Sequence, residues 1–122
     1  MAGWLARWLG RGSAAPEPTA NDRLRAALLD QGDDGRAIRF VTHYAYPATE
    51  DAAGMKDARD AVSWIAPKCR RTEDGTGLRF VHEREVASGE FDEMTETFER
   101  DFEAIGWSYD GWDCAVVPGE SR

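Results

Sequence analysis

Hydrophobic and polar residues follow two different periods along this chain, and each change of period marks a new element. Apolar residues three to four positions apart predict helices over 21–32, 49–66 and 88–106. Residues alternating with a period of two predict strands over 36–47, 68–75, 76–86 and 107–117. The Glu73-Asp74-Gly75 turn makes the two middle strands a β-hairpin. The order is therefore a helix followed by β-α-β-β-α-β.

This order predicts the fold class. Two β-α-β halves fold most simply as an antiparallel four-stranded sheet with two helices on one face. We expect an α+β, ferredoxin-like β-α-β-β-α-β sandwich with an extra N-terminal helix, capped by Asn21. The second and fourth strands would be opposite edges, so Cys69 and Cys114 would be too far apart to form a disulfide and would be free thiols.

The first strand carries its aromatic residues on one side. Its even positions are Ile38, Phe40, Thr42, Tyr44 and Tyr46. Its odd positions include Arg39, Val41 and His43. We expect the even, aromatic side to face the helices, which leaves the odd side on the open face of the sheet.

The helix over 88–106 has the clearest pattern, with Ser88 as its cap. Its apolar stripe consists of Phe91, Met94, Phe98, Phe102 and Ile105. Its opposite face presents Glu93, Glu96, Arg100 and Glu103. Two interpretations of these charges stay open: a solvated face that favours solubility, or a docking face for a basic partner. A solvated face accounts for most charge runs, but like charges three and four residues apart destabilise a helix, which makes the docking face a fair second interpretation.

Charge and composition limit the partners. The 122 residues suffice for one domain, and 23 acidic against 15 basic residues give a net charge of −8. This charge repels phosphate backbones, so we expect a basic protein partner and no direct nucleic-acid binding. The predicted strand faces also argue against RNA binding. RNA-recognition modules stack bases on aromatic side chains of the open sheet face, whereas we expect the aromatic side of the first strand to face the helices.

The N-terminal residues differ from the rest. Residues 1–20 are predicted to be a flexible tail with an amphipathic tip, and residues 21–118 to be the folded domain. The tip carries Trp4, Leu5, Trp8 and Leu9 at helical spacing. It is either a disordered tail or a short helix that touches a membrane or a partner groove, and we expect membrane contact only through residues 1–12. Arg7 interrupts the stretch that would form the apolar region of a signal peptide, so no signal peptide is indicated. The cytoplasm is therefore the expected compartment.

No catalytic motif is present in the sequence. His43 and His82 lie on different predicted strands, and together with the cysteines they match no metal-ligand spacing. There is no nucleophile elbow and no phosphate-binding glycine loop. We therefore expect both histidines to be structural, and we expect no catalytic residue, metal or cofactor.

The stretch YDGWD, residues 109–113, places two aromatic residues around an Asp-Gly pair. Glycine tolerates a positive φ, so Asp110-Gly111 predicts a turn or bulge at the start of the last strand. We expect Gly111 to adopt a conformation that disfavours side chains, and Trp112 to be at least half buried.

Three stretches together resemble one family. LLDQGDDG (28–35), HYAYPATEDAA (43–53) and the motif Tyr109, Asp110, Gly111 and Trp112 resemble the regulator of ribonuclease activity B family, protein inhibitors of ribonuclease E. The resemblance covers most of residues 21–117, and YDGW is its most specific part. It implies a ferredoxin-like, non-catalytic domain that binds the ribonuclease largely through its scaffold region and changes RNA cleavage. The alternative is a ligand-sensing ferredoxin-like regulatory domain with a different partner.

Overall fold

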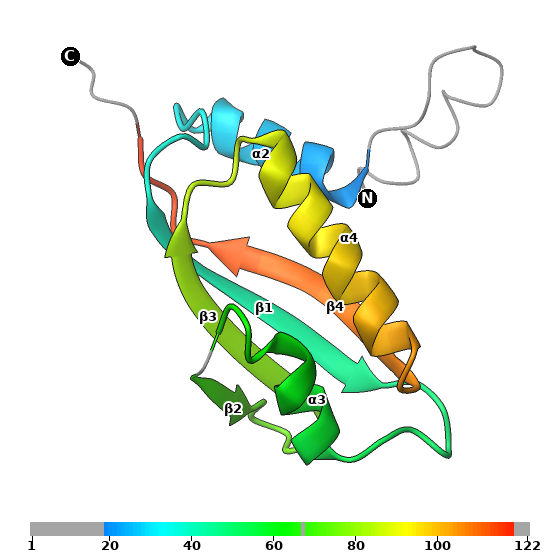
Figure 1. The fold of residues 1–122 in the computed structure, drawn as a ribbon. Coiled ribbons are helices and arrows are strands. Elements are labelled where there is room, and N and C mark those ends of the chain that lie inside the picture. Colours follow the sequence, from blue (N-terminus) through cyan, green and yellow to red (C-terminus); the bar gives the residue numbers. More distant parts are fainter. Residues whose placement is uncertain (1–18, 67, 119–122) are drawn as a thin grey trace, which may run out of the picture.

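The computed structural model describes residues 19–66 and 68–118. The elements in chain order are α2 (Ala20–Asp30), β1 (Arg39–Pro47), α3 (Met55–Val62), β2 (Cys69–Arg71), β3 (Leu78–Arg84), α4 (Gly89–Glu103) and β4 (Trp107–Cys114) (Figure 1). The strands form one sheet in the order β2-β3-β1-β4, and all neighbours are antiparallel. The predicted α+β class with a four-stranded antiparallel sheet is confirmed.

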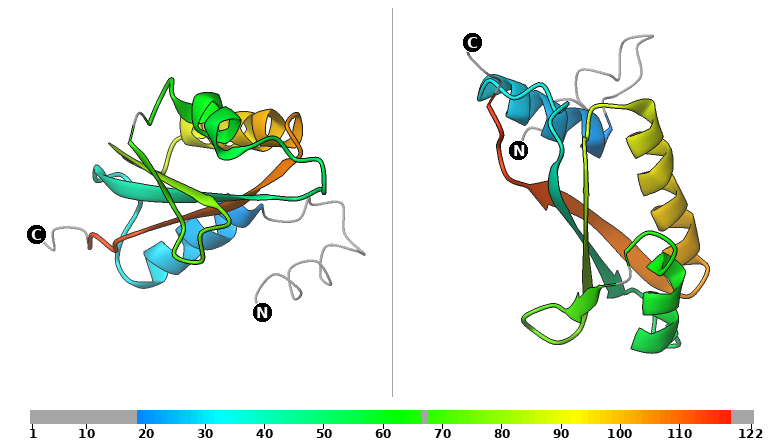
Figure 2. Two further views of the ribbon diagram at one scale, coloured as in Figure 1. Left: turned by 90° about the horizontal axis from the view of Figure 1, so that it is seen from below. Right: turned by 60° about the vertical axis from the view of Figure 1, so that its left-hand side comes forward.

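Edge strands and helices take the predicted places. Because β2 and β4 are opposite edges, Cys69 and Cys114 are both free thiols, as expected. α3 and α4 cover one face of the sheet, and α2 lies at one end, toward the other face (Figure 2). The predicted tail lies outside the described residues, except that Thr19 and Ala20 belong to the start of α2. Within those residues, no helix has the length and apolarity needed to traverse a bilayer.

α4 forms as its pattern predicts. The Ser88 hydroxyl accepts a hydrogen bond from the Phe91 amide at 3.2 Å, which caps the first turn. The buried residues of the stripe are Phe91, Met94, Phe98 and Phe102, and Ile105 packs against them. They meet Val41, Ala45, Leu78 and Phe80 from the sheet in one core.

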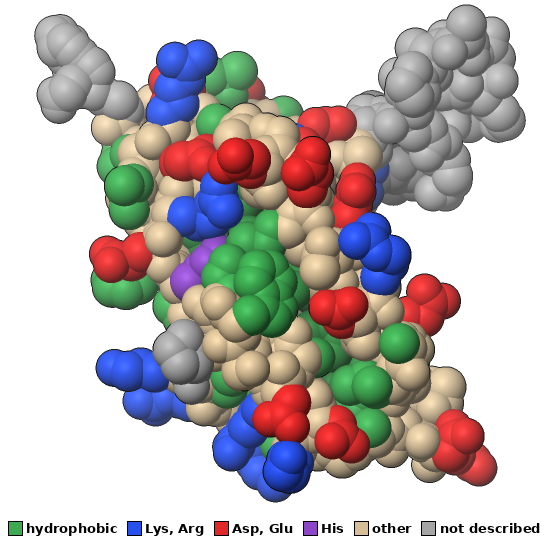
Figure 3. Space-filling view, in the orientation of Figure 1, with side chains coloured by type: hydrophobic (Ala, Val, Ile, Leu, Met, Phe, Trp, Pro, Cys, Tyr) green, Lys and Arg blue, Asp and Glu red, His purple; other side chains and the backbone are tan. Residues whose placement is uncertain are grey.

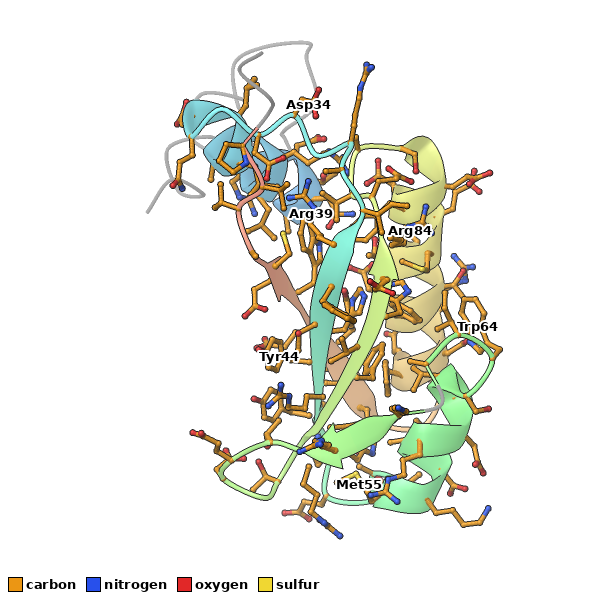
Figure 4. All side chains as sticks on the ribbon, turned by 90° about the vertical axis from the view of Figure 1, so that its left-hand side faces the viewer. Asp34, Arg39, Tyr44, Met55, Trp64 and Arg84 are labelled. Carbon is orange, nitrogen blue, oxygen red and sulfur yellow. The ribbon has the colours of Figure 1, made fainter. Side chains whose placement is uncertain are left out.

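The predicted facing of β1 is wrong. Val41 and His43 are fully buried beneath the helices, whereas Ile38 and Phe40 are 70% and 65% exposed. Tyr44 points away from the helix layer (Figure 4). Polarity misled the prediction because the polar residues on the odd side have partners: His43 is hydrogen bonded inside the core, and the Arg39 guanidinium pairs with the Asp33 carboxylate.

α3 begins six residues later than predicted, at Met55 with Gly54 as its cap. The chain from Ala48 to Ala53 instead bonds to the corner between α4 and β4. The Ala48 amide donates to the Gly106 carbonyl and the Ala53 amide to the Ile105 carbonyl, both at 2.8 Å. These tertiary bonds hold the segment away from helical geometry. The apolar spacing behind the predicted helix holds from Met55 onward, where Ala58 and Val62 are buried.

The cap of α2 is also shifted. Thr19, not Asn21, caps this helix, in a reciprocal capping box with Asp22. Asn21 is thereby free to make contacts with distant residues, which are described below.

Candidate functional site

The YDGW motif forms a β-bulge in edge strand β4. Ala45 of β1 pairs with Tyr109 and Tyr44 pairs with Gly111, so Asp110 is an extra residue. Gly111 has a φ of 105°, which confirms the predicted glycine-specific conformation. In a regular strand Tyr109 and Trp112 would point to opposite faces, but the extra residue turns both toward the helices.

Trp112 joins three elements. It is 6% exposed, so its predicted burial is confirmed, and its ring meets Phe91 edge to face at 4.9 Å. Its Nε1–H donates to Asn21 Oδ1 at 2.7 Å. The Asn21 amide nitrogen in turn donates to Asp92 Oδ1 and Thr95 Oγ1, both at 2.9 Å. The motif tryptophan therefore fastens α2 to α4 and β4.

Tyr109 ends a hydrogen-bonded chain through the core. Its hydroxyl lies 2.7 Å from His43 Nδ1, and His43 Nε2 lies 2.9 Å from His82 Nε2. Phe80 stacks on His43 at 5.0 Å, and Phe98 meets it edge on at the same distance. Burial is the main reason that the pKa of His43 is lowered to about 3 and that of His82 to about 4. The neighbouring His82 adds to the lowering at His43, and Arg84 adds to it at both histidines.

The same burial acts in the opposite direction on the tyrosine and raises the pKa of Tyr109, with Glu99 adding to the effect. All three groups are thus neutral near pH 7. Within residues 19–66 and 68–118, no group of three or more His, Cys, Asp or Glu side chains is arranged to hold a metal ion.

The four residues predicted to form a docking face on α4 are all exposed. These are Glu93, Glu96, Arg100 and Glu103. Arg100 donates to the Thr97 hydroxyl at 3.2 Å. In the described part of the chain, no ion pair engages any of these four side chains. Acidic side chains lie along the upper and right-hand borders of this side of the molecule, and at its lower end basic and acidic side chains are mixed (Figure 3).

Two hollows meet at Glu99 along one side of α4. The smaller, about 180 Å³, is lined by Thr19, Ala20, Asn21, Asp22, Asp92, Thr95, Glu96 and Glu99. The larger, about 480 Å³, is lined by Ala48, Thr49, Glu99, Glu103, Gly106, Trp107, Ser108 and Tyr109. We call the two together the acidic groove.

Only part of the predicted site lines this groove. Glu96 and Glu103 do, together with Tyr109, whereas Glu93 and Arg100 do not. Glu99 was missed because its projection lay closer to the apolar stripe. Its position three residues after Glu96 and four before Glu103 was a signal, since such residues share a helix face. No sequence pattern indicated that the start of α2 also lines the acidic groove.

No protein-family model matches this chain, and no curated protein sequence matches it. The interpretation of the site therefore depends on its own geometry and charge.

Proposed function

We propose that this chain is a non-catalytic regulator that binds ribonuclease E, or another basic protein, and changes RNA cleavage. One observation carries the proposal: the carboxylates of Glu93, Glu96 and Glu103 project from α4 without an ion-pair partner in the described residues. A row of such groups attracts and orients a basic surface. The acidic groove beside them, with Glu99 at its centre, gives that surface a shaped contact.

The identity of the partner rests on the resemblance of residues 28–35, 43–53 and 109–112 to inhibitors of ribonuclease E. The strand order β2-β3-β1-β4 with antiparallel neighbours supports the ferredoxin-like arrangement that this resemblance implies. A cytoplasmic location belongs to the same proposal, since free thiols suit a reducing compartment.

The mechanism follows from charge. Basic segments of a ribonuclease scaffold bind RNA through its phosphates, and a row of carboxylates offers these segments a competing anionic surface. Exposed charges more than about 8 Å apart are largely screened at physiological ionic strength. Binding should therefore weaken as salt rises.

Charge reversal tests the docking face. Glu93→Lys, Glu96→Lys and Glu103→Lys together leave the buried side of α4 untouched, so the fold should persist while the dissociation constant for ribonuclease E rises. The matched control is Asp30→Lys, Glu73→Lys and Glu83→Lys, which changes the net charge equally at exposed acids on other elements. Binding titrations at low and moderate salt, with circular dichroism to confirm that both variants are folded, distinguish a docking face on α4 from a general effect of net charge.

Equal weakening by both triple variants would reduce the effect to net charge and remove α4 as the docking face. If the parent fails to bind ribonuclease E at any salt concentration, ribonuclease E is not the partner.

A ligand-sensing role is the second candidate, favoured by the hollow of about 480 Å³ beside Trp107 and Tyr109. Such a hollow can hold a small polar molecule. Screening small molecules by their effect on the indole N–H resonance of Trp107 tests this role. A compound that shifts this resonance and raises the unfolding temperature would support it.

A further inference from the structure

The side of the sheet opposite α3 and α4, which α2 borders at one end, carries a row of aromatic side chains. We call this side the open face; along β1 it presents Phe40, Thr42, Tyr44 and Tyr46. Tyr44 is directly opposite Arg79 of β3, which is opposite Arg70 of β2. Directly opposite residues of antiparallel strands share a face. Aromatic rings and guanidinium groups therefore lie in one row across three strands.

The β2 side of this face is basic although the whole chain is acidic. Lys68 and Arg70 lie at this edge, next to Arg79, whereas Arg71 is opposite the buried Leu78 and so belongs to the helix-covered face. Among the described residues, the side chains of Lys68 and Arg70 make no hydrogen bond or ion pair, and Arg79 Nε is buried without a hydrogen-bond partner. A local cluster of this kind creates a positive field that differs from the net charge.

A hollow joins the rings to the guanidinium group. It measures about 440 Å³ and is lined by Tyr44, Tyr46, Thr72, Glu73, Asp74 and Arg79. The Tyr46 ring lies against the backbone of Gly77, where an added Cβ would come within 2.5 Å of it. The Tyr44 hydroxyl donates to Asp113 Oδ2 at 3.0 Å. The Tyr46 ring is thus held beside the basic edge, whereas the Tyr44 hydroxyl is held by β4 on the other side of β1.

We propose that the open face binds single-stranded RNA. The bases stack on Phe40, Tyr44 and Tyr46, as they do on aromatic platforms of other sheets. Arg70 and Arg79 contact the phosphates. The hydroxyls of Thr42 and Tyr46 lie on the same face and can bond to ribose 2′-hydroxyls, which favours RNA over DNA.

This proposal reverses the expectation that nucleic acid is excluded. That expectation assumed that the β1 aromatics face the helices, and their exposure removes the assumption. The net charge of −8 still weakens attraction at long range. Glu83 and Asp113 lie on the open face, and Glu73 and Asp74 line the hollow beside Arg79, so phosphate contacts are confined to Arg70 and Arg79. Binding is therefore of modest affinity and strongest at low salt.

Fluorescence anisotropy of a labelled ten-nucleotide oligouridylate with the full chain tests the proposal, and it needs no ribonuclease. Phe40→Ser and Tyr44→Leu should each weaken binding about fivefold or more through lost stacking. Arg70→Gln with Arg79→Gln should weaken binding and reduce the slope of log affinity against log salt by about 1.4. The matched control, Arg36→Gln with Arg100→Gln, should bind like the parent.

Denaturation midpoints of all variants confirm that each is folded. No RNA binding by the parent, or equal losses in the arginine variant and its control, would overturn the proposal. So would unchanged binding by both folded aromatic variants. Equal affinity for the matching DNA would overturn the preference for RNA. If a basic nonapeptide binds instead and Phe40→Ser weakens it, the open face is a protein-docking surface.

Discussion

Tyr109 and Trp112 point to the same side of the sheet although they are three residues apart in one strand. The extra residue in the bulge, Asp110, produces this relationship. It lets one aromatic residue reach His43 in the core while the other reaches Asn21 on α2. The pair Asp110-Gly111 therefore determines where both aromatic side chains go.

Gly111→Ala should lower the free energy of unfolding by about 1 kcal/mol or more. Nothing lies within 4 Å of a Cβ added at this position, so crowding is not the cause. The cost comes from the φ of 105°, which residues with a side chain rarely adopt. Urea denaturation of parent and variant measures the difference.

Gly89→Ala is the matched control for this substitution. Gly89 lies in the first turn of α4, and an added Cβ there also meets nothing within 4 Å. Alanine is favoured in a helix, so this variant should be as stable as the parent or more stable. Equal urea midpoints for Gly111→Ala and the parent would show that the bulge tolerates a side chain.

Asn21→Ala should weaken the attachment of α2 to α4 and β4, which Arg25, Leu24 and Leu28 still maintain in part. The substitution leaves the indole N–H of Trp112 buried without its acceptor, which costs about 1–3 kcal/mol. The control on the same helix is Gln31→Ala, since the Gln31 side chain is exposed. Denaturation should show a loss of stability in Asn21→Ala and none in Gln31→Ala. Only Asn21→Ala should also shift the indole N–H resonance of Trp112. The same midpoint in both variants would contradict this role.

Asp33 and Arg39 form an ion pair that is buried on both sides, at 1% and 5% exposure. Asp33 also accepts hydrogen bonds from the amides of Gly35 and Val117, at 2.9 and 2.8 Å. Asp33→Asn leaves the Arg39 charge uncompensated and should cost about 3–5 kcal/mol. Replacing both members, as Asp33→Leu with Arg39→Met, should cost less than the single change, which a double-mutant cycle measures.

The Asp33 pair also affects the acid limb of stability. The hydrogen bonds from Arg39, followed by those from Val117 and Gly35, hold the pKa of Asp33 well below its usual value. The resulting stabilisation is complete above the unfolded pKa of about 4 and is lost as pH falls below it. The gap in stability between the parent and Asp33→Asn should therefore narrow in acid. A constant gap down to the acid transition would contradict this assignment.

Sequence patterns predicted most of the architecture and only part of the site. The stripe of α4 and its cap at Ser88 were predictable because both depend on residues close in the chain. The facing of β1 was not, because the burial of His43 depends on Tyr109 and His82, which are 66 and 39 residues away. The acidic groove combines α4 with the start of α2 and the corner before β4. Hydrophobic periodicity within one segment cannot predict that these three segments lie together.

His43 and His82 should make the fold sensitive to mild acid. Burial holds the pKa of His43 at about 3 and of His82 at about 4, whereas histidines in an unfolded chain titrate near 6.5. The unfolded state therefore binds more protons, and stability is complete above about pH 7.5 and falls as pH decreases through 6.5. For the fully buried His43 the loss between about pH 7 and pH 5 is about 2 kcal/mol.

His82→Gln tests the contribution of His82, the half-buried histidine of the hydrogen-bonded series Tyr109–His43–His82, to this acid sensitivity. A glutamine keeps an amide group near His43 Nε2 but carries no titrating group, so the variant should lose less stability between pH 7.5 and 5 than the parent. At pH 8, where both histidines are neutral, the two proteins should differ little. Urea denaturation at three pH values provides the comparison. If parent and variant lose the same free energy on acidification, His82 does not contribute to the acid sensitivity, and the proton uptake must come from His43 or from groups outside the chain of three.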